Sequence, residues 1–327
     1  MSLPGSPRCL LRPQRSSAEQ SPGKIPRVGI LSPGEGERTP MWNAFRQGLQ
    51  DLGYVEGRNI VLEFRLAHGD YSQFPRLAAE LADLPVEVIV AGTRAVDIAS
   101  GWVPVVVPTL FDPVGQGLAS SLSRPGGNVT RFTLMSAELD AKRLELLKSA
   151  FPQISAVSVL RGGPPNAGPK TDVERIERAA AALGLGTART VEALDVASLR
   201  ALRPAVFAGT DAVIVLGSGM LWEYRRDIVA LVNQARLPAI YPDREYVDDG
   251  GLMVYGANVP DNFRRAADYV DRILKGAKPG ELPIQEPVRF DFIVNVKTAQ
   301  ELGLTISIDP RPRRRGHRIK AIGFASG

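Results

Sequence analysis

The chain repeats one pattern: a short apolar run, then a segment whose apolar positions recur every three or four residues. The first run is Val28–Leu31, and Trp42, Phe45 and Leu49 follow at helical spacing before Gly53. A continuous apolar run of this length is typical of a buried strand, and the wider spacing is typical of an amphipathic helix. The pattern therefore predicts a β-strand followed by a helix.

Three further strands continue this alternation to about residue 130. The predicted strands are Ile60–Leu66, Val86–Ala91 and Val103–Val107, and the predicted helices are Phe74–Leu84, Ala95–Gly101 and Val114–Leu122. Such alternation implies a parallel sheet with helices on both faces. We expect one sheet of this kind in the first part of the chain.

The alternation stops near residues 131–138 and then begins again. The later predicted strands are Ala156–Leu160, Ala188–Val191, Ala212–Leu216, Pro238–Tyr241, Leu252–Tyr255 and Phe290–Val296. The later predicted helices are Leu139–Phe151, Val173–Leu183, Tyr224–Ala235, Phe263–Leu274 and Thr298–Leu302, while Pro204 leaves Val196–Phe207 undecided. The repetition predicts an α/β protein with two doubly wound parallel-sheet lobes.

The two ends of the chain differ from this body in composition. Residues 1–24 are rich in Pro, Ser, Gly and Arg, and residues 309–327 contain the run Arg313–Arg315, so we expect a disordered head and a disordered basic tail. The net charge of +5 comes from these ends and leaves the body slightly acidic. The arginine run is compatible with a nucleic-acid patch, but a solvated tail is favoured, and we expect no nucleic-acid partner.

The sequence also disfavours disulfide-bonded, metal-binding and membrane-spanning proteins. Cys9 is the single cysteine, and His68 and His317 are the two histidines, so we expect no internal disulfide, no metal site and no cofactor. No apolar run approaches the ~18 residues of a membrane helix. The head lacks the apolar core of a secretory signal, so we expect no export signal within the sequence as written.

Polar residues gather where the predicted strands end. The candidates for ligand binding are Ser32, Thr93, Arg94, Thr109, Asp112, Ser218, Asp243, Glu245 and Asn258. Open α/β sheets bind ligands at this edge, where helix N-termini offer unpaired N–H groups to a carboxylate or phosphate. Acidic side chains suit an ammonium group, and Trp222, Tyr241 and Tyr255 could supply apolar walls.

Several of these candidates have a purely structural alternative. Ser32 and Thr93 suit the N-cap of a following helix equally well, and Asp112 stands before a proline in a common turn sequence. Asp243 and Glu245 could lie in a solvated loop, and Asn258 could be a turn residue. These alternatives stay open at the level of sequence.

Recognisable catalytic sets are absent from the sequence. There is no Gly-x-Ser-x-Gly elbow and no His-Glu-x-x-His motif, and neither histidine lies near a candidate nucleophile in the sequence. We therefore expect no catalytic residues, and binding rather than turnover.

An ordered set of short motifs resembles one protein family. The motifs are Arg27–Leu31, Gly48–Leu49, Leu52–Asn59, Gly69–Asp70, Phe111–Gly115, Arg124–Thr130, Leu237–Tyr241, Gly250–Gly256, Arg272–Gly276, Phe290–Asn295 and Leu302–Leu304. Together they resemble the substrate-binding proteins of ABC transporters, in the tryptophan/tyrosine-type family with a type I periplasmic-binding-protein fold. The resemblance covers roughly residues 25–308.

The resemblance implies two lobes that close about a hinge on a small ligand. It implies a first lobe of residues 25–133 and 257–283 and a second lobe of residues 134–256 and 284–308. It also implies an amino acid-like ligand, with aromatic amino acids among the candidates. Ser32, Thr93, Thr109 and Asp112 would form the first lobe's wall, and Ser218 and Asp243 the second's. Pro125–Thr130 would approach the first hinge crossing.

The family also implies partners and a location. The expected partners are the ABC permease and ATPase of an importer, and we expect a monomer in the periplasm or anchored outside the cytoplasmic membrane. This chain departs from the family in its head, its tail, Arg131 and the loop Arg161–Ala167. A sensory or regulatory ligand-binding domain of the same fold, or an α/β enzyme using Asp112, Asp243 or Glu245, remains an alternative.

Overall fold

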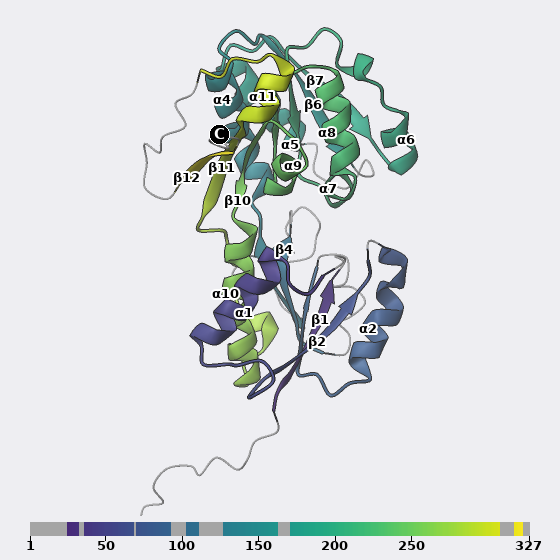
Figure 1. Ribbon diagram of the computed structural model, residues 1–327, viewed down its shortest axis with the longest axis vertical. Helices are drawn as coiled ribbons and strands as arrows, with labels where there is room; N and C mark the ends of the chain where they lie inside the picture. Colours follow the sequence, from purple (N-terminus) through teal and green to yellow (C-terminus); the bar gives the residue numbers. More distant parts are fainter. Residues whose placement is uncertain are drawn as a thin grey trace, which may run out of the picture.

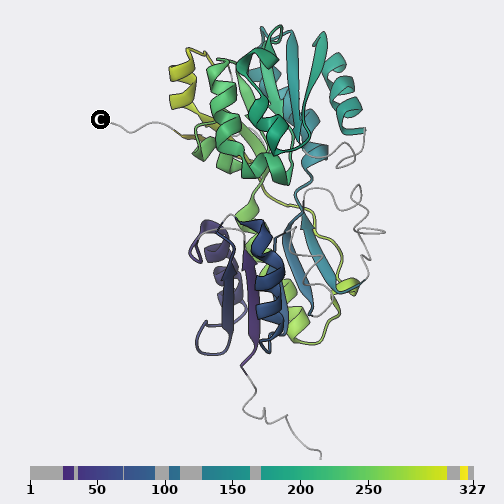
Figure 2. The same ribbon diagram turned by 90° about the vertical axis from the view of Figure 1, so that its right-hand side faces the viewer.

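The alternating segments fold into two α/β lobes, each built around its own sheet (Figures 1 and 2). The computed structural model describes residues 25–32, 36–68, 70–92, 103–110, 127–162, 171–307 and 317–322. In Figure 1 the first lobe, which contains β1, is at the bottom, and the second lobe, which contains β6, is at the top. The expected fold class, two lobes dominated by parallel strands, is confirmed.

The first lobe holds a five-stranded parallel sheet in the order β2-β1-β3-β4-β5. Its strands are β1 (Arg27–Ser32), β2 (Val61–Leu66), β3 (Val88–Ala91), β4 (Val105–Leu110) and β5 (Val129–Thr133). Its helices are α1 (Pro40–Asp51), α2 (Phe74–Ala82) and α10 (Val259–Leu274), with 3₁₀ turns η1 (Tyr71–Gln73) and η4 (Pro279–Glu281). The chain thus returns to this lobe for α10.

The second lobe holds a seven-stranded sheet in the order β12-β11-β10-β9-β8-β6-β7. Its strands are β6 (Ala156–Gly162), β7 (Thr187–Ala193), β8 (Ala212–Val215), β9 (Ala239–Tyr241), β10 (Met253–Ala257), β11 (Phe290–Asn295) and β12 (His317–Ile322). Its helices are α4 (Ser136–Ala150), α5 (Thr171–Ala182), α6 (Val196–Ala201), α7 (Gly219–Glu223), α8 (Arg225–Gln234), α9 (Arg244–Asp248) and α11 (Val296–Leu302), with the 3₁₀ turn η3 (Pro204–Phe207).

The first lobe buries apolar side chains on both faces of its sheet. On one face, Trp42 and Phe45 of α1 and Val270 of α10 pack against the strands. On the other face, Phe74 and Leu77 of α2 do the same. This two-sided burial is the reason that the strands read as continuous apolar runs in the sequence.

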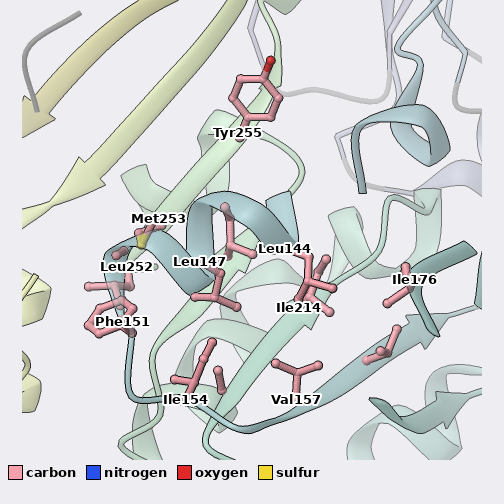
Figure 3. Close-up of a cluster of buried hydrophobic side chains, with 14 of the residues drawn as sticks. Leu144, Leu147, Phe151, Ile154, Val157, Ile176, Ile214, Leu252, Met253 and Tyr255 are labelled. Atoms are coloured by element: carbon pink, nitrogen blue, oxygen red, sulfur yellow. The ribbon is translucent and has the colours of Figure 1, made fainter. Parts of the chain in front are cut away.

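The second lobe is also covered on both faces. Leu144 and Leu147 of α4, together with Phe151 just after it, pack against Val157 of β6 and Ile214 of β8 (Figure 3). The opposite face buries residues of α6, α7, α8 and α9. Each helix therefore covers a stripe of sheet, as its apolar spacing predicts.

Three segments connect the lobes and lie beside one another. β5 continues into α4, β10 continues into α10, and the segment after η4 continues into β11. The backbone N–H of Thr133 donates to the carbonyl of Gln285 at 2.9 Å, and the N–H of Gln285 donates to the carbonyl of Arg131 at 3.1 Å. The N–H of Asn258 donates to the carbonyl of Arg289 at 2.9 Å. These bonds tie the crossing segments together.

Two stretches differ from the sequence prediction because polar residues take strand positions there. Residues 129–133 span the end of the expected hinge approach, Pro125–Thr130, and the start of the break in the pattern, but they form β5 and bury Thr130 and Arg131. The disorder expected over 309–327 is wrong for residues 317–322, which form β12 and pair in parallel with β11. Apolar periodicity cannot identify a strand whose positions are largely polar or which adds to an existing sheet edge.

Smaller differences concern local geometry. β11 runs antiparallel to β10, so the second sheet is mixed rather than wholly parallel. Arg244–Asp248 forms the short helix α9, whereas the open alternative for Asp243 and Glu245 was a solvated loop. Pro204 does divide the undecided segment, since α6 ends at Ala201 and η3 begins at Pro204. The helices predicted at Ala95–Gly101 and Val114–Leu122 lie outside the described residues.

Candidate functional site

The parallel strands of both sheets end at the boundary between the lobes. In the first lobe, β5 leads directly into the second lobe, and β4, β3, β1 and β2 all run in the same direction as β5. In the second lobe, β10 leads directly into α10 of the first lobe, and β9, β8, β6 and β7 run in the same direction as β10. The loops that follow these strands therefore share one boundary, where α/β sheets bind ligands.

The first lobe places two predicted site residues at this boundary. Ser32 is the last residue of β1 and is buried, while Thr109 is the second-last residue of β4 and is partly buried. β3 lies between these two strands, so the residues are about 10 Å apart at ~4.8 Å per strand. Thr93, Arg94 and Asp112 lie outside the described residues.

The second lobe places Ser218 and Asp243 after two neighbouring strands, β8 and β9. The hydroxyl of Ser218 accepts a hydrogen bond from the backbone N–H of Leu221 at 3.1 Å and caps α7. α7 lies at the lower end of the upper lobe in Figure 1, toward the first lobe. The cap uses a lone pair of the hydroxyl, so its hydrogen can still be donated to a ligand.

Asp243 is a buried acid at the end of β9. Asp243 is only 5% exposed, which contradicts the alternative that it lies in a solvated loop. It occupies the N-cap position of α9 without making a capping hydrogen bond. Burial, with a smaller contribution from the neighbouring charge of Glu245, raises the pKa of Asp243 to about 7, although the charges of Arg143 and Arg225 oppose the shift.

Glu245 stands beside Asp243 on α9. The indole N–H of Trp222 donates to its carboxylate, but burial dominates and raises the pKa of Glu245 above its ordinary value. Among the described residues, neither Asp243 Oδ2 nor Glu245 Oε2 has a hydrogen-bond partner, although both atoms are buried. Each of these two buried carboxyl groups therefore has one oxygen atom that no described group hydrogen-bonds.

The nearby arginines are engaged with other carboxylates. Arg225 Nε lies 2.8 Å from Asp249 Oδ2, an ion pair whose alignment is too poor for a hydrogen bond, and its guanidinium lies 4.8 Å from the ring centroid of Trp222. Arg143 pairs with Asp140, and both are almost fully buried. The charges of both arginines lower the pKa of Asp243, but the opposite effect of burial and of Glu245 is larger.

Asn258 takes part in the crossing between the lobes. Its Oδ1 accepts a hydrogen bond from the backbone N–H of Asp261 at 2.9 Å and caps α10, and its Nδ2 donates to Asp291 Oδ2 at 2.7 Å. Both polar ends of this side chain are therefore occupied by the protein. The geometry shows a structural role at the crossing, and the ligand contact expected of Asn258 stays a prediction.

Sequence reasoning missed Arg143 and Arg225 as neighbours of the site. Asp140 and Arg143 lie on the buried face of α4, next to Leu144 and Leu147. Charged residues are rarely buried unless they are paired, so their position on this apolar face could have indicated a buried ion pair. Among the suggested apolar walls, Tyr241 is fully buried and stacks on Tyr246 with ring centroids 4.9 Å apart. Tyr241 therefore belongs to the core behind Asp243.

Two other kinds of site find no support in the part of the chain that the structure describes. No group of three or more His, Cys, Asp or Glu side chains there could hold a metal ion. No helix there is both long enough and apolar enough to cross a membrane.

Comparisons with known proteins agree with this geometry. Residues 33–309 match the family described as ABC transporter substrate binding protein. A curated relative named tyrosine-binding protein, from Clostridioides difficile strain R20291, is 24% identical over 275 residues, which cover 80% of this chain and 75% of the relative.

Two solved structures have a similar fold. One is a conserved domain protein from Vibrio cholerae, with a TM-score of 0.72 and 26% identity, covering 86% of this chain and 96% of that one. The other is an ABC domain from Streptococcus pneumonia in complex with L-Trp, with a TM-score of 0.71 and 24% identity, covering 85% and 96%. The type I periplasmic-binding-protein-like arrangement expected from the sequence is thus confirmed.

Proposed function

The chain belongs to the ABC transporter substrate-binding proteins, and we propose that it binds one free amino acid between its two lobes. The observation that carries this proposal is the buried pair Asp243 and Glu245 at the boundary edge of the second sheet. An ammonium group is the compact cation that such a pair would accept. The names of the relatives, which mention tyrosine and L-Trp, favour an aromatic amino acid.

The opposite wall would come from the first lobe. Ser32 and Thr109 stand at the ends of β1 and β4, and Thr93, Arg94 and Asp112 follow strands of the same sheet in the sequence. Hydroxyl groups and an arginine suit a carboxylate. In this proposal the ligand's ammonium group contacts the second lobe and its carboxylate contacts the first.

Closure would then depend on the three crossing segments. The proposed rigid bodies are residues 25–133 with 257–283 and residues 134–256 with 284–308. A ligand held by both bodies favours the closed arrangement because it gains contacts from both walls only there. The proposed partners are the permease and ATPase of an importer, and the proposed location is outside the cytoplasmic membrane, with the protein acting as a monomer.

A thermal-shift screen tests the proposal. Free amino acids, sugars and nucleosides are each added to the full chain, and the melting temperature is recorded. A ligand at 100 times its Kd stabilises the folded protein by about 2.7 kcal/mol. We expect tyrosine or tryptophan to raise the melting temperature and to be recovered unchanged. The absence of a shift with every amino acid, or turnover of the bound compound, would reject the proposal.

A further inference from the structure

Charged and polar groups from four elements surround Asp243. Glu245 and Tyr246 face it from α9, Arg225 from α8 and Arg143 from α4, and Tyr241 precedes it in β9. Arg225 is paired with Asp249, and Arg143 is paired with Asp140. The cluster therefore contains more carboxyl groups than cations.

Unpaired polar atoms are concentrated at this place. Among the described residues, the buried atoms without a hydrogen-bond partner include Asp243 Oδ2, Glu245 Oε2 and the hydroxyl oxygens of Tyr241 and Tyr246. An ionised carboxylate that is buried without a partner is costly, whereas the neutral acid is much less so. The ligand-free site is therefore better suited to a protonated acid than to two carboxylates.

We propose that Asp243 carries a proton in the ligand-free protein and that the ammonium group of an incoming amino acid displaces this proton to the solvent. The inference rests on the proposed function, because it requires an ammonium-bearing ligand at this carboxyl group. In the exchange, the O–H bond of Asp243 breaks, its proton passes to water or buffer, and the carboxylate becomes the partner of the ligand's N–H groups. The ligand keeps all of its own protons.

The exchange makes binding dependent on pH. A pKa of Asp243 near 7 leaves most molecules protonated at pH 6 and few at pH 8. The observed Kd should therefore be about tenfold weaker at pH 6 than at pH 8. Ligand binding should release about one proton at pH 6 and almost none at pH 8.

Isothermal titration calorimetry of the full chain with L-tryptophan measures this release. The titration is run at pH 6 and at pH 8, each in two buffers of different ionisation enthalpy. We expect the binding enthalpy at pH 6 to differ between buffers by about the difference in their ionisation enthalpies, and at pH 8 to be nearly independent of buffer. Equal enthalpies in both buffers at pH 6, with clear binding, would overturn the inference and leave the proposed function intact. If no amino acid binds at either pH, both the proposed function and the inference fail.

Two variants test whether Asp243 is the residue that releases the proton on ligand binding. Asp243→Asn should bind more weakly and release no proton, and circular dichroism would confirm that it is folded. Asp227→Asn, at an exposed position on α8 of the same lobe, is the matched control and should release the proton as the wild type does. Proton release that persists in a folded Asp243→Asn variant would contradict the assignment. The wild-type buffer comparison decides the inference even if that variant does not fold.

Discussion

Arg143 Nε donates a hydrogen bond to the carbonyl oxygen of Tyr255 at 2.7 Å. This bond joins α4, which begins just after one crossing segment, to the end of β10, which leads into another. The guanidinium also pairs with Asp140 and lies close enough to Asp243 to lower that residue's pKa against the effect of burial. One buried arginine thus connects the inter-lobe crossings with the acidic site.

Breaking the buried pair should destabilise the protein strongly. Asp140→Asn leaves Arg143 charged and buried without its carboxylate, and loss of one partner of a buried pair costs about 3–5 kcal/mol. Urea unfolding of the variant measures this loss. The matched control is Glu145→Gln, which removes an exposed pair with Lys142 on the same helix and should cost at most about 1 kcal/mol. Equal costs for the two variants would show that burial does not govern the Asp140 pair.

Gly256 allows β10 to approach the chain that follows β9. A Cβ placed on Gly256 would lie 1.8 Å from the carbonyl oxygen of Pro242, next to Asp243. Gly256→Ala should therefore force a backbone shift, at a cost of about 1–3 kcal/mol, and should weaken ligand binding. Thermal unfolding and titration measure the two effects. Gly36→Ala, where an added Cβ meets no atom within 4 Å, is the control, and similar melting temperatures for both variants would refute the claim.

Two substitutions at Asn258 distinguish a structural role of this residue from a contact with the ligand. Asn258→Ala should lose about 0.5–2 kcal/mol because α10 loses its N-cap. Asn258→Ser keeps a capping oxygen and should recover much of that stability, which chemical denaturation can measure. Affinity per folded molecule should change little in Asn258→Ser. A large loss of affinity in that variant at wild-type stability would instead support the sequence prediction of a direct ligand contact.

The ligand-free protein should lose stability as pH rises, relative to an Asp243→Asn variant. The pKa of Asp243 is about 7 in the folded protein and 3.8 in its ordinary state, so the folded state binds more protons between these values. The stabilisation that this extra proton gives the folded state is fully present below pH ~4 and is lost as pH rises through 7. The free energy of unfolding falls by an amount on the order of 4 kcal/mol over this range. Urea unfolding from pH 4 to pH 8 measures it. Parallel curves for the wild type and the variant would contradict the raised pKa.

Much of the fold could be predicted from local patterns. Val28–Leu31 and Val86–Ala91 are apolar because their strands are buried on both faces, and this burial is visible without long-range information. Val129–Thr133 was not recognised as a strand, since its polar side chains are satisfied by distant segments: Thr130 donates its hydroxyl hydrogen to the carbonyl of Leu282. Pairing partners far along the chain are invisible to periodicity.

The places of several candidate residues in the fold were predictable, but their electrostatics were not. The apolar strand pattern correctly placed Ser32, Ser218 and Asp243 at or just after the carboxyl ends of strands, the edge at which α/β sheets bind ligands. The pKa of Asp243 depends on its burial and on charges brought by α4 and α8. No spacing in the sequence indicates that Arg143, a hundred residues earlier, would face that carboxyl group.

The most direct test of amino-acid binding at Asp243 is equilibrium binding of L-tyrosine and L-tryptophan to the full chain, compared with Asp243→Asn and with Asp227→Asn. We expect saturable binding of one amino acid per chain, recovered unchanged, with affinity weakened at least tenfold in Asp243→Asn and preserved in Asp227→Asn. Binding of equal strength to all three proteins, or no binding of either amino acid to the wild type, would contradict it.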